Sequence, residues 1–531
     1  MGIQLAFILI FFVIMISVGL YCRKHATNVD GFVLGGRSVG PWLTAFAFGT
    51  SYFSAVIFVG YAGQFGWEFG MASTWIGLGN AFIGSLLAWV ILGRRTRVMT
   101  QKIDSRTMPD FFDKRYFSPA LKIAASVIVF VFLVPYTASL YNGLSSIFEV
   151  SFGMVPYWAI IIIMAILTGV YVIFGGYMAT AVNDFIQGIV MLVGIVAVVG
   201  AVLASKGGFI EAYKALSSVP VPESYPASVQ GMQGAFASFV GPKPIYLFVV
   251  VILTSLGTWG LPQMIGKFYS IKNEDAIKKG TIISTVFAII VAGGCYFLGG
   301  FGRLFDSPAL YSGNGKLLTD KIVPGMLSNL PDVIIAIVIV LVLSASMSTL
   351  SSLVLTSSST LTLDVIVPAL NKNGKVISEK KKLLILRAFI VFFIVISAVL
   401  AILKDTFNFT FIAQMMGVSW GALAGAFLAP FLYGLYSKKT TRAAVAVSFV
   451  WGAGIELVQL VLMVTGKSLP GAIGFIFRNS LYSGAFSMVS GLILVPLVSL
   501  VTKKPDRARV DEIFTCYDKT ITTEVKKHLG E

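Results

Sequence analysis

The sequence predicts an all-α membrane protein with about 13 transmembrane helices. The 531-residue chain is 56% hydrophobic and only 12% charged, and its mean hydropathy of +0.87 excludes a soluble globular protein. Apolar stretches long enough to cross a bilayer as helices recur along the whole chain. Their centres lie near residues 12, 53, 83, 132, 165, 194, 254, 289, 344, 394, 421, 453 and 491.

The first stretch, GIQLAFILIFFVIMISVGLY, has neither a basic start nor a small-residue cleavage site, so we expect a retained helix rather than a signal peptide. No soluble domain interrupts the apolar stretches. We expect a transmembrane domain over residues 1–502 and a polar cytoplasmic tail over residues 503–531, which contains a short helix. The three cysteines have no paired spacing and the two histidines lie at polar edges, so the sequence indicates neither a metal cluster nor histidine chemistry.

The net charge of +16 is distributed as a topology signal. If the first helix enters from outside, alternate loops are cytoplasmic, and these loops hold nearly all of the Lys and Arg residues. The positive-inside rule then predicts an outside N-terminus, a cytoplasmic C-terminus and a multi-pass protein of the plasma membrane, in contact with the lipid bilayer. The charge gives no reason to expect a nucleic-acid partner.

Two of the expected helices contain helix breakers near the middle of the membrane. The second has Gly49, Thr50 and Ser51 at its centre, and the seventh has Pro262 preceded by two glycines. A break at this depth frees backbone groups, which a ligand, water or a neighbour must satisfy. With the first helix set aside, each broken helix leads a group of five. This placement predicts inverted repeats at about residues 40–205 and 240–436, with one leading and two trailing helices.

A hydroxyl-rich segment, SASMSTLSSLVLTSSSTLTLD, follows the apolar run that ends near residue 343. Ala345, Ser348, Thr349 and Ser352 have the i, i+3, i+4, i+7 spacing of one helix face. Two interpretations are open. Such a stripe can present oxygen atoms to a monovalent cation, but small and hydroxyl residues more commonly pack two membrane helices together.

Six segments carry a resemblance that covers almost the whole membrane region in order. They are GFVLGGRSVGPW (31–42), TMPDFFDKRY (107–116), VIFGGYMATAVNDFIQG (172–188), GLPQMIGKFYSIKN (260–273), SASMSTLSSLVLTSSSTLTLDVI (344–366) and WGALAGAFLAPFLYGLYSKKTTR (420–442). Together they resemble the sodium:solute symporter family. The resemblance implies the LeuT-type fold with an extra leading helix, and transport of a solute coupled to Na⁺.

The resemblance also implies cation ligands. The family's main sodium site matches the carbonyl groups of Thr50, Phe53 and Ala345 and the hydroxyl groups of Ser348 and Thr349. A second sodium ion, which some members carry, would match Asp184, Ser348, Ser351 and Ser352. For Asp184, a gating hydrogen bond or a position at the cytoplasmic mouth are alternatives, since an intramembrane carboxylate needs a partner. The family pattern gives Glu456 no role, and we expect it to make an interhelical hydrogen bond or to snorkel.

The solute is expected between the two broken helices and the third and tenth core helices. The matching positions are Ser54, Ile57, Ile76, Tyr136, Tyr141, Asn142, Thr258, Trp259, Gln263 and Gln414. Sugar-transporting members have polar groups where this chain has Ile57 and Ile76, and each unpaired sugar hydroxyl would cost about 1–3 kcal/mol. We therefore expect an amino acid such as proline, or a monocarboxylate. The expected pocket has no arginine, so a carboxylate would depend on helix-end amides, hydroxyl groups or sodium itself.

These observations predict a sodium-coupled secondary active symporter that imports a small organic solute by alternating access, with a single chain as the transport unit. Proton coupling, another solute, and a sodium-responsive sensor are alternatives, although the tail is too short for a sensor's output domain. The sequence has no catalytic triad, metal cluster or phosphate loop, and GxxxxGK[ST] does not occur. We expect no enzymatic activity and no catalytic residue.

Overall fold

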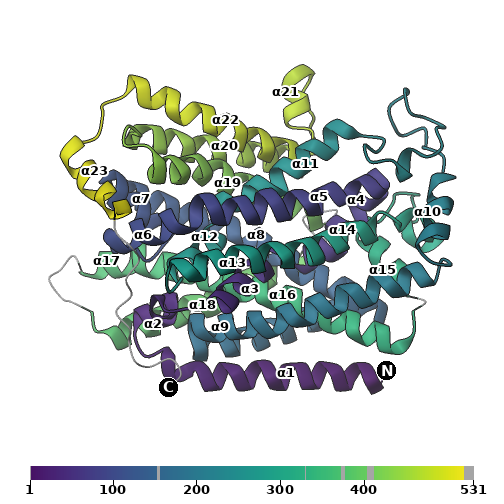
Figure 1. Cartoon of the computed structure of the whole chain (residues 1–531), viewed down its shortest axis with the longest axis horizontal. Helices are drawn as coiled ribbons and strands as arrows, with labels where there is room; N and C mark the ends of the chain where they lie inside the picture. The colour runs from purple at the N-terminus through teal and green to yellow at the C-terminus, as the bar shows by residue number, and fades with distance from the viewer. Residues whose placement is uncertain (1, 152–155, 329, 372–376, 404–411, 519–531) are drawn as a thin grey trace.

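The helices form one elongated bundle in a computed structural model that describes residues 2–151, 156–328, 330–371, 377–403 and 412–518. Most long helices run roughly along the long axis of the bundle (Figure 1). The N-terminus of α1 (Gly2–Cys22) and α10 (Phe209–Ser217) lie at one end, and α6 (Arg94–Lys102) and α7 (Met108–Tyr116) lie at the other (Figure 1). The described residues contain no strand, only isolated bridges, so the all-α class is confirmed.

The remaining helices have the following bounds. The first half of the chain forms α2 (Val29–Leu34), α3 (Pro41–Tyr52), α4 (Ala62–Phe69), α5 (Thr74–Gly79), α8 (Pro119–Ser151) and α9 (Tyr157–Ala204). The second half forms α11 (Pro244–Leu256), α12 (Pro262–Tyr269), α13 (Glu274–Ala288), α14 (Gly294–Gly299), α15 (Ile322–Leu327), α16 (Asp332–Thr360), α17 (Val367–Asn371), α18 (Glu379–Ile402) and α19 (Ile412–Tyr436). Then follow α20 (Arg442–Thr465), α21 (Gly471–Ile476), α22 (Ser480–Val501) and α23 (Arg507–Phe514).

The predicted number of about 13 spans is not confirmed. In the described part of the chain, ten helices are long and apolar enough to cross a membrane, or eleven if the bent pair α11 and α12 counts as one span. The spans expected near residues 165 and 194 are counted as one because both belong to α9, but a non-helical Gly176 (φ 55°, ψ −148°) divides this 48-residue element into two helical segments. Residues Val56–Lys102 are also counted as one span, although α4 ends before Gly70 (φ 60°, ψ −138°) and the next helix, α5, begins at Thr74.

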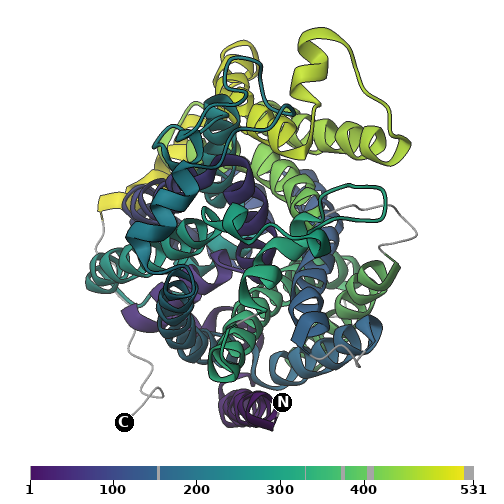
Figure 2. The same cartoon turned by 90° about the vertical axis from the view of Figure 1, so that its right-hand side faces the viewer.

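The leading helix α1 lies at the outer edge of the bundle (Figure 2) and has the pattern of a helix in contact with lipid. Its buried residues, Gln4, Phe11, Met15, Gly19 and Cys22, lie on one face. A Cβ atom at Gly19 would stand 2.7 Å from Cβ of Tyr171, so this face packs closely on α9. The other faces expose large apolar side chains. Exposure of such an area is unfavourable in water but not in the hydrocarbon of a bilayer.

Two helices lie at the centre of the bundle. The most apolar window of α19 is 94% buried and that of α16 is 78% buried, whereas that of α1 is 22% buried. The hydroxyl-rich segment belongs to the C-terminal half of α16, so its side chains face other helices rather than lipid. Any function of these hydroxyl groups therefore depends on what the neighbouring helices present to them.

Both predicted helix breaks are present, one of them shifted. Helix α3 continues through Gly49 and Thr50 and ends at Tyr52; the break falls at Phe53 and Ser54. The second break is as predicted, with a 3₁₀ turn over Gly257–Gly260, an extended Leu261 and a 46° bend into α12. Pro262 is the first residue of α12, where its fixed φ and missing N–H are tolerated.

The halves of the two broken helices nearest α6 are joined to each other. The Val39 N–H donates to the carbonyl of Ser270 (3.0 Å), and the Lys272 N–H donates to the carbonyl of Val39 (3.0 Å). The guanidinium of Arg37 extends this junction, because it donates to the carbonyl of Ser105 (2.5 Å) in the loop before α7. We therefore expect these two half-helices to move together.

The trailing helices pack on α19 through small residues. The hydroxyl of Ser483 on α22 donates to Oε1 of Glu456 on α20 (2.8 Å), so the predicted interhelical hydrogen bond of Glu456 is confirmed. A Cβ atom at Gly421 of α19 would stand 2.4 Å from this oxygen, so the glycine makes room for the acid. The predicted short helix of the tail is α23; residues 519–531 lie outside the described residues.

Candidate functional site

Four of the five predicted ligands of the main sodium site lie together where α16 crosses the first helix break. The hydroxyl oxygens of Ser348 and Thr349 each lie 3.2 Å from the carbonyl oxygen of Thr50. The carbonyl oxygen of Ala345 lies 3.2 Å from the Ser348 hydroxyl and 3.1 Å from the Thr349 hydroxyl. All four residues are fully buried, so two hydroxyl groups and two carbonyl groups form an uncharged cluster of oxygens.

The helix break explains why the carbonyl of Thr50 is available. Thr50 is in the last turn of α3, where backbone carbonyls lack the usual helical partner. The neighbouring carbonyl of Gly49 accepts from the N–H of Phe53 (3.0 Å), which closes the helix. Phe53, the fifth predicted ligand, follows in an extended conformation (φ −86°, ψ 116°), which turns its carbonyl out of the helical ladder.

The residues predicted for a second sodium ion are arranged differently. Nζ of Lys267, on α12, lies 2.9 Å from the hydroxyl of Ser352 and 3.4 Å from Oδ2 of Asp184. The side chains of Lys267 and Asp184 are 4% and 0% exposed. The Ser352 hydroxyl is also 2.7 Å from that of Ser51 on α3. Two of the four predicted ligands therefore surround an ammonium group.

The other two predicted ligands of the second ion, Ser351 and Ser348, make contacts away from Asp184. The Ser351 hydroxyl donates to the carbonyl of Ser348 in its own helix (2.9 Å). The Ser348 hydroxyl belongs to the first cluster of oxygens, beside Thr50. The structure thus brings Asp184 and Ser352 together, but it does not gather Ser348 and Ser351 around them.

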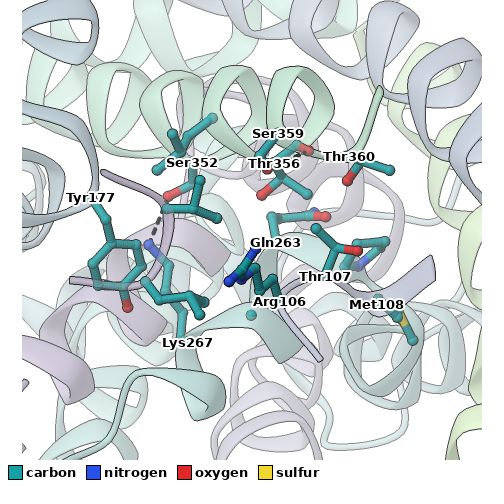
Figure 3. A pocket seen from close by; sticks show the side chains of 15 residues that line it. Arg106, Thr107, Met108, Tyr177, Gln263, Lys267, Ser352, Thr356, Ser359 and Thr360 are labelled. Atoms are coloured by element: carbon teal, nitrogen blue, oxygen red, sulfur yellow. Dashed lines mark hydrogen bonds between the residues drawn. The ribbon is translucent and has the colours of Figure 1, made fainter. Parts of the chain in front are cut away.

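A small cavity of about 50 Å³ lies beside Lys267, toward α6 and α7. Figure 3 shows that hydroxyl groups of α16 border it opposite Lys267, Gln263 and Arg106. Its polar lining on α16 comes from Ser352, Thr356, Ser359 and Thr360. A row of hydroxyl groups on α16 therefore leads from the residues beside the first cluster to the cavity.

An aromatic cluster lies on the other side of the first break. The rings of Tyr52 and Trp420 stack with centroids 5.9 Å apart, and Tyr136 meets Trp420 edge to face at 6.1 Å. The hydroxyl of Tyr136 lies near the Ser54 hydroxyl and the indole N–H of Trp420, yet it makes no hydrogen bond of standard geometry. A Cβ atom at Gly257, in the second break, would stand 3.5 Å from the Trp420 ring. Trp420 therefore bridges both breaks.

The other predicted solute-binding residues are dispersed. Thr258 and Trp259 donate to backbone carbonyls of Gly84 (3.1 Å) and Ile83 (3.0 Å), so these two side chains hold helices together. Gln263 lines the cavity beside Lys267 instead of the aromatic cluster.

The five remaining predicted positions lie on four different elements. Ile57, Ile76, Tyr141 and Asn142 are buried. Asn142 donates to Sδ of Met415 (3.7 Å), and the carbonyl of Gln414 accepts from the Ser480 hydroxyl (3.2 Å). Of the predicted solute-binding residues, Ser54 and Tyr136 therefore lie together at the aromatic cluster. The contact of Asn142 with Met415 connects α8 with the start of α19.

The predicted site residues did not include Trp420, Tyr52 or Lys267. Trp420 begins the segment WGALAGAF, and Lys267 lies within GLPQMIGKFYSIKN, so both were in segments that carried a signal. For Lys267 the signal was a charged residue a few positions after a mid-membrane break, which requires a buried partner. Asp184 was the available acid, but nothing in the sequence places residues 83 positions apart side by side.

Comparison with known families identifies the class of transporter to which the chain belongs. The model of the sodium:solute symporter family matches residues 32–452. The chain belongs to this family. As predicted, Na⁺ is the coupling ion, and the activity is sodium-coupled symport of a solute across a membrane that the chain crosses several times.

The symporter is similar over nearly its whole length to proteins named for proline transport. It is 28% identical to sodium/proline symporter 2 of Staphylococcus saprophyticus over 511 residues, 94% of this chain and 93% of the relative. It is 26% identical to the osmoregulated proline transporter OpuE of Bacillus subtilis over 511 residues, 94% and 95% of the two chains.

A solved structure shares the fold of the symporter. A Na⁺-coupled sialic acid symporter in a substrate-bound outward-open state superposes with a TM-score of 0.71. The match covers 95% of this chain and 99% of that chain, at 15% sequence identity. The predicted fold class is therefore confirmed.

Proposed function

We propose that this symporter imports a small amino acid together with Na⁺, and that L-proline is its solute. The observation that carries the proposal is the buried oxygen cluster of Thr50, Ala345, Ser348 and Thr349 beside an aromatic cluster, at one helix break. Similarity over 94% of the chain to a sodium/proline symporter supports proline over other amphipathic solutes.

In this proposal Na⁺ binds first and links two helices. The ion takes the carbonyls of Thr50, Phe53 and Ala345 and the hydroxyls of Ser348 and Thr349. These hydroxyls now donate toward the same carbonyls, so they would turn their protons away and offer lone pairs to the ion. All ligands are neutral, which keeps the affinity modest and lets the ion leave again.

The solute would then bind at the break beside the ion. Tyr52, Tyr136 and Trp420 present an apolar and aromatic wall to the pyrrolidine ring of proline. The Ser54 hydroxyl and the start of the helix after the break suit its carboxylate, because a helix N-terminus carries partial positive charge. Sodium binding thus prepares the solute site by fixing the position of Thr50 and the break that follows it.

The structure around α16 suggests a route by which Na⁺ leaves. From Ser348 the hydroxyl groups of Ser352, Thr356 and Ser359 follow one another along α16 to the cavity near α6 and α7. We place this end in the cytoplasm, with the N-terminus outside and the C-terminus inside, because the basic loops gather there. We also propose a plasma-membrane location, a single chain as the transport unit, and core repeats at about residues 40–205 and 240–436.

Thermal unfolding of the purified protein tests the function. Melting temperatures are compared in NaCl and in KCl, with L-proline, L-lactate or D-glucose added. We expect L-proline to raise the melting temperature in NaCl only, because a ligand that binds only the folded, sodium-loaded protein stabilises it by linkage. A stabilisation by L-lactate instead would assign a monocarboxylate, and an equal effect of L-proline in both salts would refute sodium coupling.

A further inference from the structure

Lys267 has the environment of a bound cation. Its side chain extends from α12 between α9 and α16, where Nζ contacts the Ser352 hydroxyl (2.9 Å) and the Asp184 carboxylate (3.4 Å) (Figure 3 shows the first contact). The face of the Tyr177 ring lies 5.4 Å from Nζ. These are the kinds of group that would hold a sodium ion: a carboxylate, a hydroxyl and a π face.

The position of this ammonium coincides with that expected for a second ion. Asp184 and Ser352 are two of the four residues that match a second sodium site, and Lys267 contacts both of them. Ser351 makes its hydrogen bond inside α16, and Ser348 faces Thr50. Asp184 and Ser352, which would neutralise and hold a second ion, therefore already contact the ammonium group of Lys267.

We propose that the ammonium of Lys267 is a tethered replacement for the second sodium ion, so that this symporter binds one Na⁺ per chain. The inference rests on the sodium coupling proposed above and adds its stoichiometry. A sodium ion about 4 Å from the ammonium would bind about a thousandfold more weakly than beside a neutral group, since both carry positive charge. Asp184 can neutralise one cation at this position, and Lys267 provides it.

The number of bound ions can be counted without any solute. Equilibrium binding of ²²Na⁺ to purified protein gives the number of sites per chain and the Hill coefficient. The wild type is expected to bind one Na⁺ with a Hill coefficient near 1. Lys267→Met removes the ammonium and leaves Asp184 unpaired, so a second Na⁺ should bind and the number of sites per chain should rise from one to two.

Two control variants separate this role from simple packing. Lys267→Arg keeps a cation at the position and should still bind one Na⁺. The double variant Asp184→Asn/Lys267→Met removes both charges, so it should also bind one Na⁺. A purely structural ion pair predicts that both Lys267→Met proteins behave alike, with one site each, and that result would overturn the proposal.

The wild-type count decides the question even if a variant fails to fold. Two saturable sites per wild-type chain would overturn the role of Lys267 and leave sodium coupling intact. No saturable site would overturn sodium coupling and this inference together. Two results together would establish both sodium coupling and the role of Lys267. The wild type would bind one Na⁺ with an affinity that Thr349→Ala weakens tenfold, and Lys267→Met would bind a second Na⁺.

Discussion

Thr349 places one hydroxyl between two carbonyl oxygens, those of Thr50 on α3 and Ala345 on α16. Replacement of Thr349 by Ala removes one ligand of the proposed ion and leaves the packing of α16 nearly unchanged. A hydrogen bond or contact to a charged group contributes about 1.5–3 kcal/mol, so the sodium concentration for half-maximal uptake should rise about 10- to 100-fold. The sodium dependence of L-proline uptake into vesicles measures this change.

Thr349→Ser serves as the control for that variant, because it keeps the hydroxyl and loses only a methyl group. Its sodium dependence should stay within a few fold of the wild type. If Thr349→Ala had the same sodium dependence as the wild type, the oxygen cluster would be helix packing, the alternative that the sequence left open.

Tyr136 offers a test of the solute site that barely disturbs the fold. Its hydroxyl is buried and makes no hydrogen bond of standard geometry, so Tyr136→Phe should leave the melting temperature without solute unchanged or slightly raised. If the hydroxyl contacts the solute, the stabilisation by L-proline should fall, and its affinity should drop about tenfold. The stabilisation by Na⁺ alone should persist.

The matched control is Tyr296→Phe, on α14, which lies near Tyr52 but is not one of the three rings of the cluster; its hydroxyl is also buried without a hydrogen bond of standard geometry. Its response to L-proline should equal that of the wild type. If the stabilisation by L-proline fell equally in both variants, the hydroxyl groups would act on the fold and not on the solute.

At the scale of single elements, the sequence located the two broken helices but misplaced one break. Pro262 cannot lie inside an unbroken helix, so the second break could be placed well. Gly49 was wrongly interpreted as a helix breaker. Its small size instead allows close packing, because a Cβ atom there would stand 2.5 Å from the ring of Phe287 on α13. Helix α3 therefore continues past Gly49, and the break follows where the chain reaches Phe53.

This interpretation of Gly49 predicts a specific destabilisation. Gly49→Ala should lower the free energy of unfolding by about 1–3 kcal/mol, because it overpacks the contact between α3 and α13. Gly200→Ala, on α9 with open space around the added methyl, should leave the melting temperature unchanged or raise it. Thermal unfolding in NaCl compares the two variants.

A second substitution shows whether the contact itself is responsible. Phe287→Leu shortens the opposing side chain, so the double variant Gly49→Ala/Phe287→Leu should recover part of the lost stability. If the losses of stability in the two single variants were additive in the double variant, overpacking would not explain the effect, and Gly49 would be interpreted again as a helix breaker.

For the molecule as a whole, hydropathy and the six segments were sufficient to predict the class of fold, the family and the residues of the oxygen cluster. They could not show which distant side chains meet. Tyr52 and Trp420 stack, and Lys267 pairs with Asp184, only because the helices cross at particular points. Such crossings depend on close packing at small residues, and many arrangements of apolar helices satisfy the same hydropathy pattern.

The proposed orientation in the membrane follows from charge alone, and cysteine labelling tests it. The native Cys22, Cys295 and Cys516 are all buried, so they give little background. Burial also raises the pKa of the Cys516 thiol to about 11, which keeps it in the unreactive thiol form at neutral pH. New cysteines can therefore be placed one at a time in exposed loops and their labelling read without removing the native ones.

Lys467 and Lys439 are exposed on the loops that follow and precede α20, so they lie on opposite sides of the membrane if α20 crosses it once. With the basic loops in the cytoplasm, Lys467→Cys should react with a membrane-impermeant maleimide in intact cells, whereas Lys439→Cys should react only after permeabilisation. The reverse pattern would invert the proposed topology and make the cavity beside Lys267 an outer opening. Labelling of both in intact cells would mean that α20 does not cross the membrane.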